Sequence, residues 1–460
     1  MSTNEISVPR IGRVIAAASF GFAVVQLDVT IVNVALPAIR TALRTDTSML
    51  QWSVDGYALS FAVLLLSAGV LSDHIGGRSA YLLGFILFAL ASAACGFAPD
   101  IGWLVGARVA QGIGAALLVP SSLSLINAAA AGDHALRARA VGIWTAAGGV
   151  TIAAAPVVGG LLMQSFSWRS IFLVNLPLCL IGAAMTWRYA PPARRTGEAR
   201  PFDPAGQLLA ILALTGLIAA IIELRSWQSE RAVVMTAATL AVLAAIAFVR
   251  VEARVAQPML PLGFFRQTTF SSCVVFGVLM NLVYYGMLFV LTLYLQTVHG
   301  YSALQTGTAY LPLTATFILS NLVSQPLTAR IGARASMTGG AVLAACGYAL
   351  LARLDAGSGY RDMLAAFAAI PFGMGVAIPV MTTTILGSVE QQWSGTVSGA
   401  LNAARQAGGA TGVAIFGALV AGSGAEVVAG LHAAAWLSST LAGIAAITVW
   451  MGVRHEHQRT

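Results

Sequence analysis

The sequence has no lysine and few charged residues of any kind. Of its 460 residues only 9% are charged, all 25 basic residues are arginine, and 58% are apolar. A soluble domain carries about a quarter charged residues and less than half apolar ones. The composition therefore excludes a soluble enzyme, a disordered protein and a collagen-like fibre. It also excludes a lysine Schiff base or general base, since arginine stays protonated at working pH.

Patterns that bind metals, nucleotides or nucleic acids are also missing. The six histidines show no metal-ligand spacing, and the four cysteines lie singly in apolar runs, where buried inert thiols are expected. No Gly-rich stretch ends in Lys-Ser or Lys-Thr, so there is no Walker loop to bind ATP. The arginines are scattered between the apolar runs, which indicates a topology signal and not a nucleic-acid-binding patch. We therefore expect no cofactor, no metal and no nucleic-acid partner.

Long apolar runs make up most of the chain. At roughly 20 apolar residues per transmembrane helix, the apolar content is enough for about 13 spans. The breaks between the runs, which are charged or rich in Pro and Gly, separate fourteen candidate spans. The spans lie near residues 11–37, 51–71, 79–98, 101–127, 139–163, 168–188, 204–223, 232–250, 269–297, 304–326, 335–353, 363–386, 396–422 and 432–453. The sequence therefore predicts an all-α integral membrane protein.

The distribution of arginine predicts the orientation of these spans. The first run continues to about Pro37, so it is expected to be a retained helix and not a signal peptide. With the N-terminus inside, sixteen arginines fall on inner segments, seven fall on outer loops, and Arg108 and Arg405 lie within spans. This distribution satisfies the positive-inside rule, so both termini are expected to be cytoplasmic.

An internal repeat suggests two related halves. LSDHIGGR at residues 71–78 matches LTARIGAR at 327–334, so the two copies are 256 residues apart. Six helices of roughly 30 residues each are too short to account for that separation. Two inserted helices account for most of the difference. We expect six-helix bundles at 1–190 and 269–460, joined by a linker with two extra transmembrane helices at 191–268. Chance similarity between two short basic loops is the alternative.

Five motifs resemble signatures of the major facilitator superfamily. Residues 69–78 resemble its cytoplasmic signature after the second helix, and residues 104–116 resemble the arginine motif of its fourth helix. LDVTIVNVALP at 27–37 and NAARQAGG at 402–409 are similar to features of its fourteen-helix drug:proton antiporter branch. WSVDGY at 52–57 is similar to the methylenomycin A resistance group of that branch.

The resemblance implies the major facilitator fold and a function. It implies a monomeric antiporter that exports small amphipathic drugs or antibiotics across the bacterial inner membrane by alternating access, driven by the proton gradient. A symporter or facilitator for a small metabolite on the same fold is the first alternative. The second alternative is a membrane sensor or scaffold without transport. The ionisable residues inside the spans argue against it, because such residues are costly in a bilayer.

Three residues are candidates for proton coupling. Asp28 lies about 15 Å, and Arg108 roughly 10 Å, from the outer end of their predicted helices. Either they exchange a proton as the site opens to water, or they form a static ion pair that locks two helices. Asp55 lies only about 6 Å from the outer end of the second span. It either attracts a cation or carries a second proton, or it is a helix-terminal acid favoured by the helix dipole.

The remaining candidates fall into three groups. A polar group inside the spans either contacts substrate, forms a gate or is structural; it comprises Asn33, Asn402, Arg405 and Gln406. A cytoplasmic gate, in which an acid pairs with an arginine across the inner face while that side is closed, would use Gly69, Asp73, Gly76 and Arg78. A helix-packing motif of the fifth span comprises Gly142, Pro156, Gly159 and Gly160.

Overall fold

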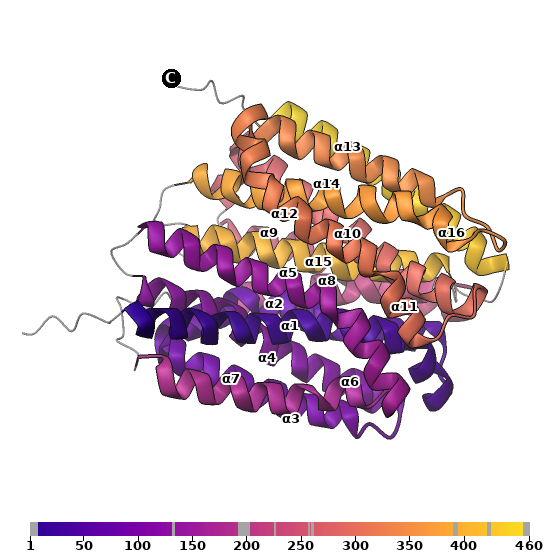
Figure 1. Ribbon diagram of the computed structural model, residues 1–460, viewed down its shortest axis with the longest axis horizontal. Coiled ribbons are helices and arrows are strands. Elements are labelled where there is room, and N and C mark those ends of the chain that lie inside the picture. Colours follow the sequence, from indigo (N-terminus) through magenta and orange to yellow (C-terminus); the bar gives the residue numbers. More distant parts are fainter. Residues whose placement is uncertain are drawn as a thin grey trace, which may run out of the picture.

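The chain folds into a bundle of long, roughly parallel helices (Figure 1). The computed structural model describes residues 8–130, 134–191, 203–224, 227–255, 258, 262–389, 394–420 and 425–453, in which all regular structure is helical. The N-terminal helices are α1 (Val8–Leu43), α2 (Thr47–Ile75), α3 (Gly77–Gly96), α4 (Ile101–Ala129), α5 (His134–Ser165), α6 (Ser170–Leu173) and α7 (Asn175–Tyr189). A pair follows, α8 (Pro204–Glu223) and α9 (Trp227–Glu252). The C-terminal helices are η2 (Leu262–Arg266), α10 (Thr268–Leu293), η3 (Tyr294–Val298), α11 (Ala303–Ala309), α12 (Leu311–Ile331), α13 (Ala333–Leu351), α14 (Tyr360–Gly387), α15 (Ser394–Leu419) and α16 (Ala425–Gly452).

The N-terminal and C-terminal helices form two groups that meet along a seam. In Figure 1 the first group occupies the lower part of the bundle and the second the upper part. Helices α2 and α15 pack against each other across the seam, as do α5 and α11. Helix α8 packs on α9, α2 and α15, and therefore borders both groups.

Short polar residues define where several helices begin. The Asp46 carboxylate accepts a hydrogen bond from the Met49 N–H (2.9 Å), and the Asp100 carboxylate accepts one from the Trp103 N–H (2.8 Å). Such N-caps satisfy backbone donors that have no partner inside the helix. Gly76 and Gly332, which precede α3 and α13, have φ values of 87° and 82°, a region that favours glycine.

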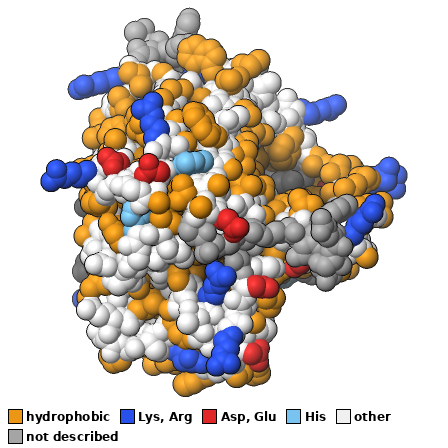
Figure 2. Space-filling view, turned by 90° about the vertical axis from the view of Figure 1, so that its right-hand side faces the viewer, with side chains coloured by type: hydrophobic (Ala, Val, Ile, Leu, Met, Phe, Trp, Pro, Cys, Tyr) orange, Lys and Arg blue, Asp and Glu red, His pale blue; other side chains and the backbone are white. Residues whose placement is uncertain are grey.

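Much of the outer surface is apolar. Ten helical segments of the described residues are long and apolar enough to cross a membrane. Figure 2, which views the molecule from the right-hand end of Figure 1, shows charged side chains standing singly or in small groups among hydrophobic ones. The chain is therefore an integral membrane protein. The number of spans, fourteen by sequence, stays a prediction.

The cysteines follow the predicted pattern with one exception. Cys95, Cys179 and Cys273 are buried, but Cys346 is exposed. The prediction of a buried thiol is wrong for Cys346 because this face of α13, with Leu343, points away from the bundle.

Candidate functional site

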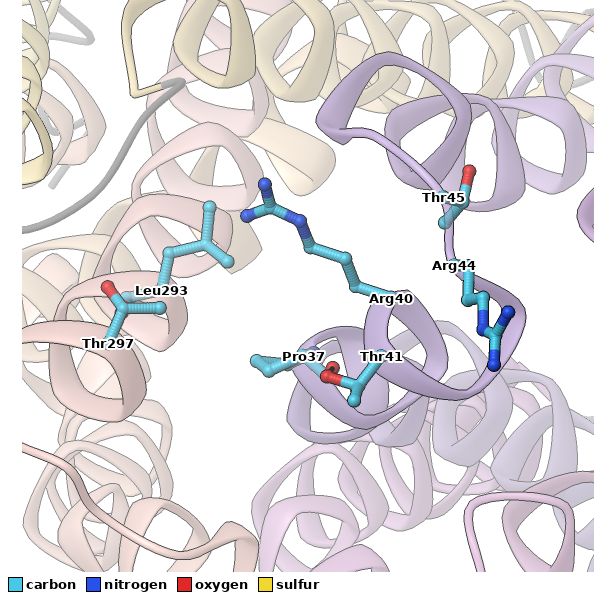
Figure 3. A pocket seen from close by; sticks show the side chains of 7 residues that line it. All are labelled: Pro37, Arg40, Thr41, Arg44, Thr45, Leu293 and Thr297. Atoms are coloured by element: carbon cyan, nitrogen blue, oxygen red, sulfur yellow. Dashed lines mark hydrogen bonds between the residues drawn. The ribbon is translucent and has the colours of Figure 1, made fainter.

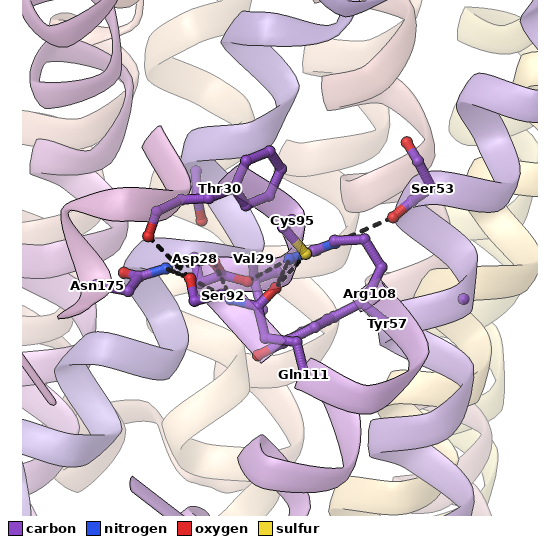
Figure 4. A network of polar contacts seen from close by, with 12 residues as sticks. Asp28, Val29, Thr30, Ser53, Tyr57, Ser92, Cys95, Arg108, Gln111 and Asn175 are labelled. Atoms are coloured by element: carbon purple, nitrogen blue, oxygen red, sulfur yellow. Dashed lines mark hydrogen bonds and ion pairs between the residues drawn. The ribbon is translucent and has the colours of Figure 1, made fainter. Parts of the chain in front are cut away.

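A buried ion pair joins α1 to α4. Asp28 is completely buried, and its Oδ2 accepts a hydrogen bond from Nη1 of Arg108 at 2.5 Å (Figure 4). Its Oδ1 accepts hydrogen bonds from the side-chain amides of Gln111 and Asn175, both at 2.8 Å. Among the described residues it is the one ion pair within 4 Å. The structure thus brings together Asp28 and Arg108, the two residues that sequence reasoning selected first.

A second layer of polar groups holds the two amides in place. The Ser92 hydroxyl of α3 accepts from the amides of Gln111 (3.1 Å) and Asn175 (3.0 Å), and it donates to the Phe172 carbonyl (2.8 Å). The Cys95 thiol donates to Gln111 Oε1 at 3.6 Å. The carboxylate of α1 is therefore fixed by groups from α3, α4 and α7. Sequence reasoning missed Gln111 and Asn175 as partners of Asp28, and Ser92 as the residue that holds both amides, although Gln111 lies within the arginine motif.

Arg108 is also held by α2. Its Nε donates to the Ser53 carbonyl (3.0 Å), and its Nη1 donates to Gln111 Oε1 (2.8 Å). Its guanidinium carbon lies 4.2 Å from the centre of the Tyr57 ring, within the range of a cation–π interaction. The arginine is therefore held by α2 as well as by Asp28.

This arrangement allows a proton to compete with an arginine. One oxygen of Asp28 is occupied by two amide donors, while the other is occupied by Arg108. A proton on Asp28 would remove the negative charge that attracts Arg108, so protonation would weaken the ion pair at that atom. In this structure the pair ties α1 to α4 through a single carboxylate oxygen.

Asp55 lies deeper in its helix than the sequence predicted. Helix α2 begins at Thr47, so Asp55 is about 12 Å along it, more than two turns from the start. It is completely buried, and neither carboxylate oxygen has a hydrogen-bond partner among the described residues. The prediction that Asp55 lies near the end of its span is wrong because α2 starts four residues before the apolar run.

The face of α2 that carries Asp55 meets α15. Gln51, one turn earlier, donates its amide to the carbonyls of Val413 (3.3 Å) and Ala414 (3.1 Å). A spacing of four residues places Asp55 on nearly the same face. An unpartnered carboxylate therefore lies near the seam between the two groups of helices.

Arg405 lies in a second polar contact, between α10 and α15. Arg405 of α15 donates from Nε to Asn281 Oδ1 of α10 (3.3 Å), and the Asn281 amide donates back to the Arg405 carbonyl (3.1 Å). Asn402 and Gln406 are half-buried on the same helix. The amide of Asn33 donates to carbonyls of its own helix, at Val29 and Thr30. The structure therefore groups Arg405 with Asn281 and leaves Asn33 apart.

The cytoplasmic motif makes a contact within the N-terminal helices. Arg78 donates from Nη2 to the Trp187 carbonyl (2.7 Å), and its guanidinium lies 5.0 Å from the indole ring of Trp187. Gly76 supplies the left-handed turn between α2 and α3, and Gly69 is half-buried on α2. The side chain of Asp73 lies outside the described part of the chain, so the predicted pairing of this acid stays a prediction.

The packing motif of α5 lies against α1 and α11. A Cβ at Gly159 would lie 2.8 Å from Ile31 Cγ1, and a Cβ at Gly160 would lie 2.5 Å from Leu304 Cα. A Cβ at Gly307 of α11 would lie closer still to the backbone of Pro156. The surroundings of Gly142 lie outside the described residues. Two helices from opposite groups therefore touch at a point where only glycine fits.

We expect Gly160→Leu to block this contact and to reduce transport strongly. The Leu304 backbone cannot move aside as a flexible side chain can, so α5 and α11 would be forced apart. The matched control is Gly149→Leu on the same helix, where a Cβ meets nothing within 4 Å. Transport by each variant, measured at equal amounts of inserted protein, checks the expectation. Equal rates for the two variants would contradict it.

A cavity of about 380 Å³ opens at the end of α1 (Figure 3). Arg40 extends across it toward Leu293 of α10, while Pro37 and Arg44 contribute to its other walls. Sequence reasoning had treated Arg40 and Arg44 only as outer-loop charges. The structure places both beside a cavity that borders helices of both groups.

The chain is similar along most of its length to proteins of one family. The sequence model of the Major Facilitator Superfamily matches residues 18–413. The Methylenomycin A resistance protein of Streptomyces coelicolor is 37% identical, with 88% of this chain and 85% of the relative covered. The protein of the same name from Bacillus subtilis is 35% identical (95% and 93% covered). The Multidrug resistance protein Stp of Mycobacterium tuberculosis is 36% identical (92% and 76% covered).

Solved structures show the same fold. A bacterial homolog of the human lysosomal transporter Spinster, in an inward-facing and unoccupied conformation, aligns with a TM-score of 0.67 at 18% identity, with 97% of both chains covered. The xylose transporter XylE from E. coli, in a partially occluded inward open conformation, aligns with a TM-score of 0.68 at 14% identity, with 98% of this chain and 100% of that chain covered. The chain therefore belongs to the Major Facilitator Superfamily and is a membrane transporter, not an enzyme.

Proposed function

We propose that this transporter exports small amphipathic drugs or antibiotics across the bacterial inner membrane in exchange for protons. Resistance proteins that share 35–37% identity over most of the chain support a drug substrate. The observation that carries proton coupling is the buried pair of Asp28 and Arg108, whose carboxylate can hold either the arginine or a proton. The single chain is proposed as the transporting unit.

The helices are proposed to form fourteen spans. Helices α6 and α7 meet at Val174 and together have the length of one span, and α11 and α12 meet at Tyr310 in the same way. Each remaining α-helix is a span of its own, and α8 and α9 form the inserted pair. The proposed domains are residues 1–190, 191–268 and 269–460. Helix α1 begins and α16 ends at the left-hand end of Figure 1, which fits termini on one side, proposed to be cytoplasmic.

The proposed cycle follows from the competition at Asp28. With Oδ2 free of a proton, Arg108 ties α4 to α1. A proton that arrives from outside takes Oδ2 and releases Arg108 toward Ser53 and Tyr57, which already hold it. Release of the proton to the cytoplasm restores the pair. Asp55 is a second candidate carrier, because its buried oxygens have no hydrogen-bond partner among the described residues.

This structure is proposed to represent the state that is closed at the outer end. Besides the contact between Gly160 and Leu304, the Gln296 amide donates to the Val34 carbonyl at 3.0 Å. Both contacts lie toward the end of the bundle where α1 ends. Substrate would accordingly enter from the cytoplasm or the inner leaflet before the two groups of helices move.

Two experiments test the function. A panel of drug-susceptibility tests in a pump-deleted bacterial host should show resistance to at least one amphipathic compound. In proteoliposomes with an imposed pH gradient, that compound should then cause proton release from its side of entry. Accumulation of a metabolite that uncouplers abolish would instead indicate a symporter, and resistance without proton movement would refute coupling.

The orientation predicts that single cysteines at positions 195 and 455 are labelled from the cytoplasm, and one at 357 from outside. Positions 195 and 455 lie outside the described residues. Gly357 is in an exposed turn, where hydrogen bonds from the Ser358 hydroxyl and the Gly357 N–H hold the pKa of Asp355 below its ordinary value. This turn is therefore built to face water. In a background without the native cysteines, labelling of position 357 only from inside would overturn the orientation.

A further inference from the structure

The two internal repeats share a geometry that their sequences do not reveal. Arg78 begins α3 and stacks on Trp187 near the end of α7, with 5.0 Å from the guanidinium carbon to the ring centre. Arg334 begins α13 and stacks in the same way on Trp450 near the end of α16, at 4.0 Å. Both pairs lie at the left-hand end of the bundle in Figure 1, where α1 begins. Each group of helices therefore carries an arginine–tryptophan pair at an equivalent place.

Both pairs leave a strong donor without an acceptor. The Nε atoms of Arg78 and Arg334 are buried and have no hydrogen-bond partner among the described residues. A buried donor of a charged group is costly to leave unpaired, and both arginines are only half-buried, so a shift of either side chain would offer its guanidinium to an acceptor outside the chain. The indoles of Trp187 and Trp450 are 70% and 52% exposed, so each donor lies beside an aromatic surface that faces outward.

The surroundings of each pair are basic. Arg13 and Arg188 lie over the Tyr189 ring, at 5.5 Å and 5.9 Å, beside the first pair. In the second repeat Arg330 is exposed, and Ala329 stands where the first repeat has Asp73. The one ion pair of the described residues joins Asp28 to Arg108, so no described carboxylate lies within ion-pair distance of these arginines.

We propose that each pair binds the phosphate of an anionic phospholipid headgroup. A guanidinium offers a planar fork that matches phosphate oxygens, and an exposed tryptophan beside it favours the boundary between headgroups and acyl chains. The proposed orientation places both sites in the cytoplasmic leaflet, where anionic lipids attract basic residues near the membrane. Lipid binding depends on this orientation only for the choice of leaflet and does not depend on drug export.

The test is binding of phosphatidylglycerol, compared with phosphatidylcholine, to the full chain by native mass spectrometry. Wild type should retain phosphatidylglycerol selectively, and added salt should weaken that retention. Arg334→Gln and Arg78→Gln should each weaken binding by about fivefold, the expected effect of one basic residue at the surface. The control is Arg353→Gln, which removes the charge of an exposed arginine at the other end of the bundle.

A second pair of variants distinguishes binding at these sites from nonspecific attraction to positive charge. Trp450→Leu keeps the charge but removes the stacking contact, so it should also weaken phosphatidylglycerol binding. Arg334→Lys should retain more phosphatidylglycerol than Arg334→Gln. Equal retention of the two lipids by wild type would overturn the proposal. So would unchanged binding in the double variant Arg78→Gln, Arg334→Gln. Neither readout uses transport, so these outcomes leave the export proposal untouched.

Discussion

Asp28→Asn is expected to abolish proton-driven export while leaving the protein inserted in the membrane. The asparagine oxygen can still accept from the amides of Gln111 and Asn175, so most of the network survives. Its amide nitrogen faces Arg108 where Oδ2 stood, and it can neither accept that hydrogen bond nor exchange a proton. The variant therefore has no switch between α1 and α4.

The measurement is substrate-induced proton release in proteoliposomes with an imposed pH gradient. Asp100→Asn is the matched control, because Asp100 caps α4 outside the network and asparagine caps a helix about as well. Asp28→Glu should keep part of the activity with a shifted pH optimum. Wild-type coupling in Asp28→Asn would show that the proton travels elsewhere, and Asp55→Asn would then be the variant to test.

The pairing of Asp28 with Arg108 could be predicted because depth restricts the choices. An ionisable residue inside a span needs a partner in the bundle, and arginine has the reach to bridge helices that lie at different depths. The amides of Gln111 and Asn175 could not be predicted in the same way. Polar uncharged residues are frequent in the helices, and only the packing of α3, α4 and α7 decides which of them face Asp28.

The second centre was predicted less well for a related reason. Asn402 and Gln406 flank Arg405 in sequence, but the Arg405 side chain donates its hydrogen bond to Asn281 on another helix. Sequence proximity gives neighbours along one helix, whereas pairing within a bundle is decided by which helices pack, here α10 and α15. The depth of Asp55 was missed because hydropathy marks the apolar run and not the polar turn at the start of α2.

Arg108→Leu is expected to lose transport and also to destabilise the protein. Removing one partner of a buried ion pair leaves an uncompensated charge, which costs about 3–5 kcal/mol. Asp28 would keep only its two amide donors, and Oδ2 would face an apolar side chain. The change also removes the contacts of Arg108 with Ser53 and Tyr57, which are two of the contacts between α4 and α2.

The double variant Asp28→Asn, Arg108→Leu separates charge from packing. It has neither charge, so its apparent melting temperature should recover most of what Arg108→Leu loses, while transport stays absent. The four proteins form a double-mutant cycle that reports the coupling between the two residues. Arg353→Leu, a change of the same type at an exposed position, should leave both stability and transport close to wild type.

Two outcomes would contradict this account. If stability does not recover in the double variant, Arg108 stabilises the protein mainly through its contacts with α2, and loss of the ion pair is not the cause of the destabilisation. If Arg108→Leu still exports its substrate with protons, the competition between Arg108 and the proton at Oδ2 is wrong as a mechanism.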